Sequence, residues 1–333
     1  MASTLVIAPN FLLPYSRPAQ FSDYRCVVNV AGTAVIFERT TLESAGGTGN
    51  PQLQLLDLTT SGSGPQPFLS NPSFAISNRP DWSWTTGNVA FNYDDPVMVA
   101  VVGSSGVYAT QFGAQTERMN YPTWFPDGAI LAVEACPGNP KPNTTIINGA
   151  NGNVQQRTVA GPYFWGSMPS VNPVNPNLIA FAGSHVQEGQ TYDEDLNFIW
   201  VVDISNSVPP VPLEAQAPRT GYDPNFQGRA PWWSPSGKWV VFESNRLIQP
   251  TQPGDPGMYA IFLCEHGRSN PAIQVTDPMY DCNHAKWFPK GFHGHPRGAF
   301  KLIVAAYQPN PPGEPAWPYG LASLDLTPLG IPF

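Results

Sequence analysis

Short apolar runs bounded by turn-forming residues recur along this chain. Within residues 229–269, an apolar run at 231–234 is followed by Pro235, Ser236 and Gly237, and a second apolar run spans 239–242. Val, Phe and Trp favour extended strands, while Pro and Gly supply the backbone angles of a tight reversal. The pattern predicts antiparallel strands joined by short turns.

The same order of residues recurs in copies along the chain. It is clearest at residues 79–91, 121–133 and 229–242, weaker after Pro169 and His284, and most degenerate at 24–37. Equivalent positions lie 42 to 62 residues apart, at Val28, Trp82, Trp124, Val171, Trp233 and Trp287. A repeat of this length, with about four short strands per copy, is typical of a β-propeller. We interpret the repeated tryptophans as packing between blades, because each indole buries a large area.

The repeat resembles that of a known family. Residues 231–237 read Pro-Trp-Trp-Ser-Pro-Ser-Gly and residues 122–128 read Pro-Thr-Trp-Phe-Pro-Asp-Gly, each followed by an apolar strand. This turn and strand resemble the blade repeat of TolB-type six-bladed β-propellers, over about residues 24–326. The resemblance implies the fold more than a function, since the scaffold hosts periplasmic adaptors, peptidase gating domains and sugar-active enzymes.

The repeats predict one all-β domain over residues 1–333, because a single blade cannot bury its apolar face alone. We expect a six-bladed β-propeller of four-stranded antiparallel blades. Its approximate blades are 24–70, 78–118, 120–160, 167–216, 229–277 and 283–328, the last completed by residues 1–10. Pairing of the N- and C-terminal strands would then close the ring and remove its sheet edges.

Composition narrows the classes of partner. The chain has 39 Pro and 30 Gly, yet 41% of its residues are hydrophobic, which is typical of a turn-rich globular protein and not of disorder. Its net charge is −8 and no Lys/Arg cluster occurs, so a nucleic-acid partner is not expected. No apolar run is long enough to predict a membrane span. The uncharged polar surface favours a periplasmic or secreted protein, although the first residues do not read as a signal peptide.

Loop lengths predict which face of the propeller is functional. With strands counted from the channel outward, the turns between first and second strands are short. The loops between second and third strands are long, at residues 43–52, 136–143, 184–197, 245–257 and 308–319. Long loops on a rigid scaffold commonly carry binding sites. We therefore expect the functional face on that side.

The segments that enter this face at the channel mouth are rich in Asn, Arg, Tyr and Trp. Aromatic rings and planar amide or guanidinium groups suit small polar, carbohydrate-like ligands. The predicted ligand-binding residues are Tyr24, Arg25, Arg79, Asn120, Tyr121, Trp165, Tyr222, Arg229, Asn283 and His284. The alternative is structural, with Tyr and Asn capping chain crossings and Arg pairing with neighbouring acids.

Two clusters are candidate metal sites, and no other cofactor is predicted. His293 and His295 form a His-x-His pair suited to a transition metal. Oligogalacturonate lyases have a similar pair at a manganese site, but no accompanying Gln or further His is found here. The acidic group Asp193, Glu194 and Asp195 suits calcium. The alternatives are a solvated glycine-rich turn and a solvated acidic loop.

Catalytic motifs are sparse. The chain has no Gly-x-Ser-x-Gly elbow and no phosphate-binding loop. Candidate catalytic residues are Asp81, Asp223, Asp281 and His284, whose alternative role is to cap turn amides. The leading hypothesis is a non-catalytic propeller that binds a protein partner or a small polar ligand. The alternative is a propeller hydrolase or lyase acting on a carbohydrate-like substrate.

Overall fold

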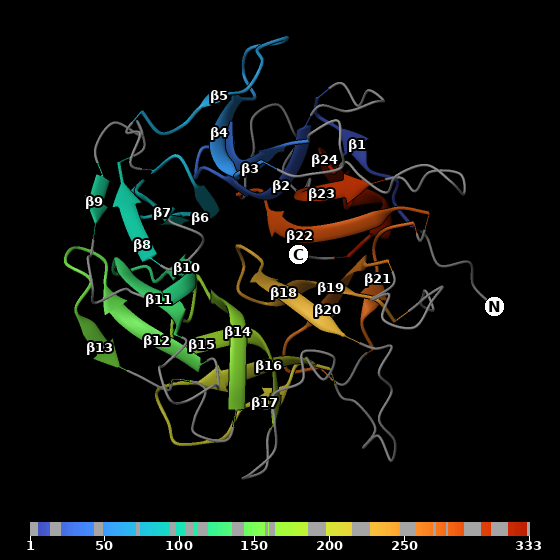
Figure 1. Ribbon diagram of the computed structural model, residues 1–333. Helices are drawn as coiled ribbons and strands as arrows, with labels where there is room; N and C mark the ends of the chain where they lie inside the picture. The colour runs from blue at the N-terminus through green and yellow to red at the C-terminus, as the bar shows by residue number, and fades with distance from the viewer. Residues whose placement is uncertain are drawn as a thin grey trace.

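Six four-stranded antiparallel sheets form a ring around a central axis in the computed structural model (Figure 1). The structure describes residues 6–13, 21–42, 49–70, 74–93, 98–103, 109–111, 119–134, 143–156, 159, 164–185, 198–214, 227–246, 258–268, 271–277, 279–289, 301–307 and 319–331. Within these ranges, no helix has the length and apolar character needed to cross a bilayer. The all-β, six-bladed fold predicted from the repeats is confirmed.

The blades follow one another in chain order. Blade 1 contains β2 (Phe21–Val28), β3 (Ala34–Thr41), β4 (Gln52–Asp57) and β5 (Gln66–Pro67). Blade 2 contains β6 (Ser77–Trp82), β7 (Val89–Tyr93), β8 (Met98–Val102) and β9 (Ala109–Gln111). Blade 3 contains β10 (Met119–Trp124), β11 (Ala129–Glu134), β12 (Asn143–Asn148) and β13 (Val154–Gln156).

The remaining blades include one that is built from both ends of the chain. Blade 4 contains β14 (Phe164–Val171), β15 (Leu178–His185), β16 (Phe198–Asp203) and β17 (Val211–Pro212). Blade 5 contains β18 (Gly228–Trp233), β19 (Trp239–Ser244), β20 (Ala260–Glu265) and β21 (Ile273–Gln274). Blade 6 contains β22 (Asp281–Trp287), β23 (Lys301–Tyr307), β24 (Gly320–Asp325) and the N-terminal β1 (Asn10–Phe11).

Strand β1 closes the ring as the outer strand of blade 6. It pairs antiparallel with β24, with Asn10 opposite Ser323 and Phe11 opposite Ala322. Just before it, Ile7 bridges Thr276, which follows β21 in blade 5. The closure by pairing of the two terminal strands, predicted from the sequence, is confirmed.

The repeated tryptophans pack between blades. Trp233 and Trp287 are among the largest fully buried side chains. The indole of Trp124 donates to the carbonyl of Asp81 in the preceding blade, at 3.1 Å. Trp287 likewise donates to the carbonyl of Trp232, at 3.3 Å. These indoles therefore supply both apolar contact and a directional bond across the blade boundary.

Tight turns join the first and second strands of the blades where the sequence predicts them. Gly237 has φ of 69°, and a Cβ at this position would lie 2.5 Å from Oδ1 of Asn172 in blade 4. The Asn172 side chain also donates to the Gly237 carbonyl at 2.9 Å. Glycine is thus required both for the turn and for the close approach of the neighbouring blade.

Buried cysteines are part of the apolar core. Cys26, Cys264 and Cys282 are buried and free of disulfide bonds, and Cys136 lies outside the described residues. Burial raises the pKa of the Cys26 and Cys264 thiols to about 12. These three thiols are therefore protonated at neutral pH and behave as small apolar side chains.

Each innermost strand carries a β-bulge at the same repeat position. The pairing register shifts there in all six strands, and one non-glycine residue adopts φ between 38° and 51°. These residues, which we call the left-handed ring, are Arg25, Arg79, Tyr121, Met168, Ala230 and His284. Such a backbone costs about 1–2 kcal/mol for a residue with a Cβ. Bulges re-aim side chains, and here they do so toward the ring centre.

Side chains of the neighbouring blade hold several of these strained positions in place. The backbone amide of a left-handed residue donates to a polar side chain on the second strand of the preceding blade. The pairs are Arg79 to Glu38 at 3.4 Å, Tyr121 to Asn92 at 3.0 Å and His284 to Glu243 at 2.6 Å. The polar groups exposed by the bulge are thereby satisfied between blades, as buried amides require.

Candidate functional site

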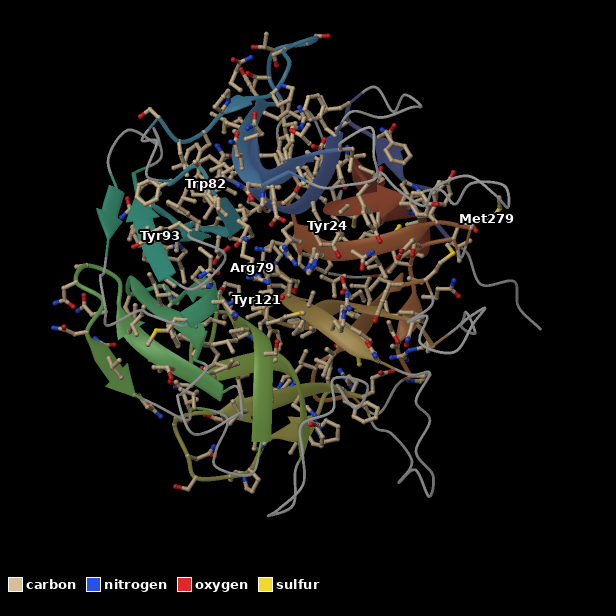
Figure 2. All side chains as sticks on the ribbon, in the orientation of Figure 1. Tyr24, Arg79, Trp82, Tyr93, Tyr121 and Met279 are labelled. Carbon is tan, nitrogen blue, oxygen red and sulfur yellow. The ribbon has the colours of Figure 1, made fainter. Side chains whose placement is uncertain are left out.

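A pocket on the propeller axis is lined by the left-handed ring, so that every blade contributes to it. Its empty space, counted together with the solvent at its mouth, is about 480 Å³. The remaining lining residues are Pro80, Pro122, Pro169, Pro231, Trp232, Ala285 and Lys286. Figure 2 places Arg79 and Tyr121 near the middle of the ring of inner strands. We call this site the channel pocket.

Two of the arginines near the axis are held by carboxylates behind the pocket wall. Arg25 donates through Nη1 to both carboxylate oxygens of Glu38, each at 3.0 Å. Arg229 lies 2.8 Å from the fully buried carboxylate of Glu243, and its guanidinium stacks over Tyr259 at 4.1 Å. Arg25 lines the channel pocket, whereas Arg229 does not. The second strands of blades 1 and 5 thus supply the counter-charges.

Lys286 links blade 6 to blade 2. Its Nζ lies 3.6 Å from the Asp81 carboxylate, donates to the Pro80 carbonyl at 3.3 Å and sits 3.9 Å from the centre of the Trp232 ring. Burial lowers the pKa of Lys286, and the Asp81 carboxylate opposes that shift. The Asp81 carboxylate also accepts from Thr123 and from the backbone amide of Trp124, both at 3.0 Å.

Arg79 has no carboxylate at its guanidinium among the described residues. The group stacks over the Tyr121 ring at 4.3 Å, and its Nε and Nη1 are buried without a hydrogen-bond partner in the part of the chain that the structure describes. Burial lowers the pKa of Arg79, and the neighbouring charge of Arg25 lowers it further. This cation is therefore less compensated than Arg25 or Lys286.

His284 is buried in a cationic environment. Its ring meets the edge of Tyr24 with centroids 4.6 Å apart, and only 8% of the residue is exposed. Burial lowers its pKa well below the usual range, and Arg25 and Arg229 add to the effect. His284 is therefore neutral at physiological pH.

Asp281 belongs to a hydrogen-bonded group beside the pocket. It accepts from the Tyr319 hydroxyl at 2.7 Å, from the Asn283 amide at 2.9 Å and from the Tyr259 backbone at 2.9 Å. Burial raises the pKa of Asp281, against the effect of the Tyr319 hydrogen bond. The carboxylate is engaged by structural donors and does not line the channel pocket.

The opposite end of the channel forms a second pocket, of about 600 Å³. Half-buried Trp84 and Trp232 line it, together with buried tryptophans of the packing layer. Trp232 and Lys286 line both pockets, so they separate the two ends of the channel. We call this end the Trp mouth.

Comparisons with known proteins agree with this architecture. A structure assigned as TolB from Agrobacterium tumefaciens is 16% identical, covers 76% of each chain and has a TM-score of 0.51. TolB from Acinetobacter baumannii is 12% identical over 89% of this chain and 64% of its own, with a TM-score of 0.50. The chain has the six-bladed β-propeller fold of these TolB structures.

The TolB-type fold is shared by proteins with different activities. A puromycin-hydrolysing peptidase from Mycobacterium tuberculosis is 15% identical over 93% of this chain and 49% of its own, with a TM-score of 0.50. No protein-family model and no curated protein sequence matches the chain. The propeller scaffold alone therefore does not distinguish binding from catalysis.

The TolB-type fold brings together a subset of the predicted ligand-binding residues. Arg25, Arg79, Tyr121 and His284 line the channel pocket. Others lie next to it or behind its wall: Tyr24 against His284, Arg229 on Glu243, and Asn283 on Asp281. Asn120 is half-buried in β10, and its Oδ1 has no hydrogen-bond partner among the described residues.

Several predicted residues lie outside the described part of the chain. They are Tyr222, Asp223, His293, His295, Asp193, Glu194 and Asp195; the side chain of Trp165 in β14 is not described either. Both candidate metal clusters belong to this set and remain predictions. Among the residues that the structure describes, no group of three or more metal-binding side chains occurs.

Sequence reasoning missed Lys286 and the carboxylates behind the pocket. Lys286 and Asp81 occupy the same repeat position, one residue before the packing tryptophan, and carry opposite charges. Glu38 and Glu243 likewise share a position on the second strand, opposite Tyr24 and Arg229. Comparing polar residues at equivalent repeat positions would have identified both pairs.

Proposed function

We propose that this protein is a non-catalytic propeller that binds a small polar ligand in the channel pocket. The observation that carries the proposal is the convergence of one residue from every blade on a single pocket. Six strained backbone positions cost free energy, and such strain is retained where the surroundings or the function require it. The unpartnered Nε and Nη1 atoms of Arg79 support a site whose hydrogen bonds are completed by a ligand.

The arrangement of carboxylates favours binding over catalysis. Hydrolysis or lysis of a carbohydrate-like substrate by acid–base chemistry needs carboxyl groups that face the substrate. Asp81 and Asp281 instead accept hydrogen bonds from side chains and backbone amides of the scaffold. Neither lines the channel pocket, although Asp81 lines the Trp mouth, so a hydrolase or lyase is the second candidate.

Binding of a protein partner is also proposed, at the loop face predicted from the sequence. TolB proteins and a peptidase share the scaffold, and propellers commonly present loops on one rigid face. Such a partner would contact the rim of the ring, whereas the small ligand occupies its axis. The two roles are therefore tested separately.

A thermal-shift screen tests the channel pocket. The panel contains neutral mono- and disaccharides, amino acids, short carboxylic acids and their amides. The pocket-filling variant Ala230→Leu is compared with Ala150→Leu, which adds the same side chain at an exposed turn residue. We expect at least one compound class to raise the Tm of the wild type and of Ala150→Leu, but not of Ala230→Leu.

Two outcomes contradict the proposal. If every stabilising compound acts equally on all three proteins, the ligand binds elsewhere. If product analysis shows that the wild type converts a saccharide of the panel and that Asp81→Asn abolishes the conversion, the protein is an enzyme and the second candidate replaces the first.

A further inference from the structure

The charge of the channel pocket is opposite to that of the whole protein. The chain has a net charge of −8, yet the pocket lining contains Arg25, Arg79 and Lys286 and no Asp or Glu. Glu38, which compensates Arg25, lies behind the wall, and Asp81, which compensates Lys286, lines the Trp mouth and not the channel pocket. A ligand in the pocket therefore meets cationic groups directly and anionic groups only at a distance, which favours a negative charge.

Arg79 is the cation whose hydrogen bonds and charge an anionic ligand would satisfy. Arg25 has Glu38 at 3.0 Å and Lys286 has Asp81 at 3.6 Å, whereas the Arg79 guanidinium has no carboxylate within 4 Å among the described residues and feels Glu38 only from farther away. A buried charge without a directly paired counter-charge is costly, and a hydrogen-bonded carboxylate would relieve that cost. His284, which also lines the pocket, is neutral and adds no charge of its own.

The other side of the left-handed ring is apolar. Arg25 and Arg79 come from blades 1 and 2, while Met168 and Ala230 come from blades 4 and 5, on the opposite side of a six-bladed ring. Four prolines complete the wall at the next repeat position. The pocket is therefore amphipathic across its width, cationic on one side and apolar on the other.

We propose that the channel pocket binds a small organic carboxylate. Its carboxylate would bind Arg79, and its apolar body would pack against Met168, Ala230 and the prolines that line the pocket. This inference rests on the proposed ligand-binding function and specifies the class of ligand. An inorganic anion would use only the cationic side, and a neutral sugar would leave the Arg79 charge uncompensated.

Isothermal titration with matched probes tests the ligand class. Benzoate and benzamide have the same shape and differ in charge, while acetate carries the charge without the apolar ring. We expect the wild type to bind benzoate more tightly than benzamide and more tightly than acetate. Replacing Arg79 with Gln should weaken benzoate binding at least about tenfold, as expected for loss of a charge-assisted hydrogen bond.

Two further variants serve as controls. Arg268→Gln removes one positive charge at an exposed site of blade 5, where the Arg268 side chain is 66% exposed, and should leave benzoate affinity unchanged. Arg79→Lys keeps the charge and loses the planar fork, so its affinity should lie between those of wild type and Arg79→Gln. Circular dichroism and the unfolding midpoint of each variant establish that it is folded.

The outcomes separate this inference from the function on which it rests. Equal binding of benzoate and benzamide, or unchanged benzoate binding by folded Arg79→Gln, overturns the carboxylate assignment. If Ala230→Leu blocks a neutral compound while no carboxylate binds, the proposed function stands and the ligand class is wrong. If acetate binds as tightly as benzoate, the apolar half of the assignment fails. If nothing binds in the pocket, both proposals fail.

Discussion

Ala230 holds a left-handed backbone without a long side chain that would explain the strain. Its φ is 47°, whereas the next alanine of an inner strand, Ala285, follows the left-handed residue and has no positive φ. Strain at this position is therefore imposed by the bulge and not by an interaction of the Ala230 side chain. Substitution by glycine at Ala230 and at Ala285 therefore compares a strained backbone position with an unstrained one.

We expect Ala230→Gly to maintain or raise stability and Ala285→Gly to lower it. Glycine at Ala230 relieves about 1–2 kcal/mol of left-handed strain and loses about 0.5–1 kcal/mol through chain entropy. At Ala285, which is 2% exposed, only the losses apply. Chemical denaturation should separate the two variants by about 1–2 kcal/mol. If Ala285→Gly is as stable as Ala230→Gly or more stable, then glycine relieves no strain at Ala230 and the bulge of blade 5 is not strained.

Glu243 links three elements near the axis. Its carboxylate is fully buried, binds Arg229 at 2.8 Å and accepts the His284 amide at 2.6 Å. Replacing Glu243 with Ala leaves a partly buried cation and an amide without their partner, so we expect a loss of about 3–5 kcal/mol in the free energy of unfolding. The control Glu265→Ala breaks the exposed pair with Arg268 and should cost less than about 1 kcal/mol. Similar losses in both variants would show that the buried pair contributes little.

His284 makes stability depend on pH. It is neutral in the folded protein, because burial and the cations Arg25, Arg229 and Lys286 hold its pKa well below 6.5. The His284 side chain of the unfolded protein takes up a proton as the pH falls through about 6.5. The free energy of unfolding therefore falls by up to about 1.4 kcal/mol per pH unit below that value. We expect His284→Gln to reduce the decline in unfolding free energy between pH 7 and pH 5.

The control for this measurement is His266→Gln. His266 is half-buried beside Trp233, and burial lowers its pKa. Since the nearby cations act on His284 alone, the decline should be reduced less by His266→Gln than by His284→Gln. Identical pH profiles for the wild type and His284→Gln would contradict a neutral, buried imidazole.

At the scale of the element, the N-terminal segment from Ile7 to Leu12 closes the ring of blades. Ile7 bonds to blade 5 through the Val275 carbonyl, and Leu12 bonds to β24 through the Leu321 carbonyl. Ile7 and Phe11 also pack on the core between blades 5 and 6. One short segment thus links blades 5 and 6, while blade 6 contacts blade 1 on its other side through the bond from the Asp23 amide to the Tyr319 carbonyl.

Removing residues 1–13 should lower the Tm and promote aggregation. The deletion leaves the edge of β24 unpaired, and an exposed strand edge is a template for association. The Tm and light scattering of the truncated protein are compared with those of Phe11→Ala, which loses side-chain packing but keeps the β1–β24 backbone pairing. If the deletion behaves like Phe11→Ala, strand closure adds little to the stability of the ring.

The blades could be predicted from the sequence because each needs the same turn and the same packing residue. Gly128, Gly237 and the repeated tryptophans mark them directly. The bulges could not be predicted, since Arg, Tyr and Met give no local signal for a left-handed backbone. Lys286 was missed for another reason: it lies beside Trp287, in a segment interpreted as scaffold.

At the scale of the whole molecule, the channel has two unlike ends. The channel pocket presents cations and prolines, and the Trp mouth presents indole rings. Lys286 and Trp232 stand between them, joined by the contact of Nζ with the indole ring. Arg25, Arg79, Tyr121 and His284 converge because equivalent positions of all six blades meet at the axis, a relation that linear spacing implies only once the ring is closed.

The left-handed ring also has a consequence for how such proteins diversify. Each blade places one side chain at the axis through a backbone feature that the whole blade maintains, and the present chain uses Arg, Arg, Tyr, Met, Ala and His. Exchanging any one of these side chains changes the chemistry of the pocket without altering a turn or an indole of the packing layer. The six side chains of the left-handed ring thus set the ligand specificity of the pocket, and relatives with the same blades can bind a different ligand by changing them.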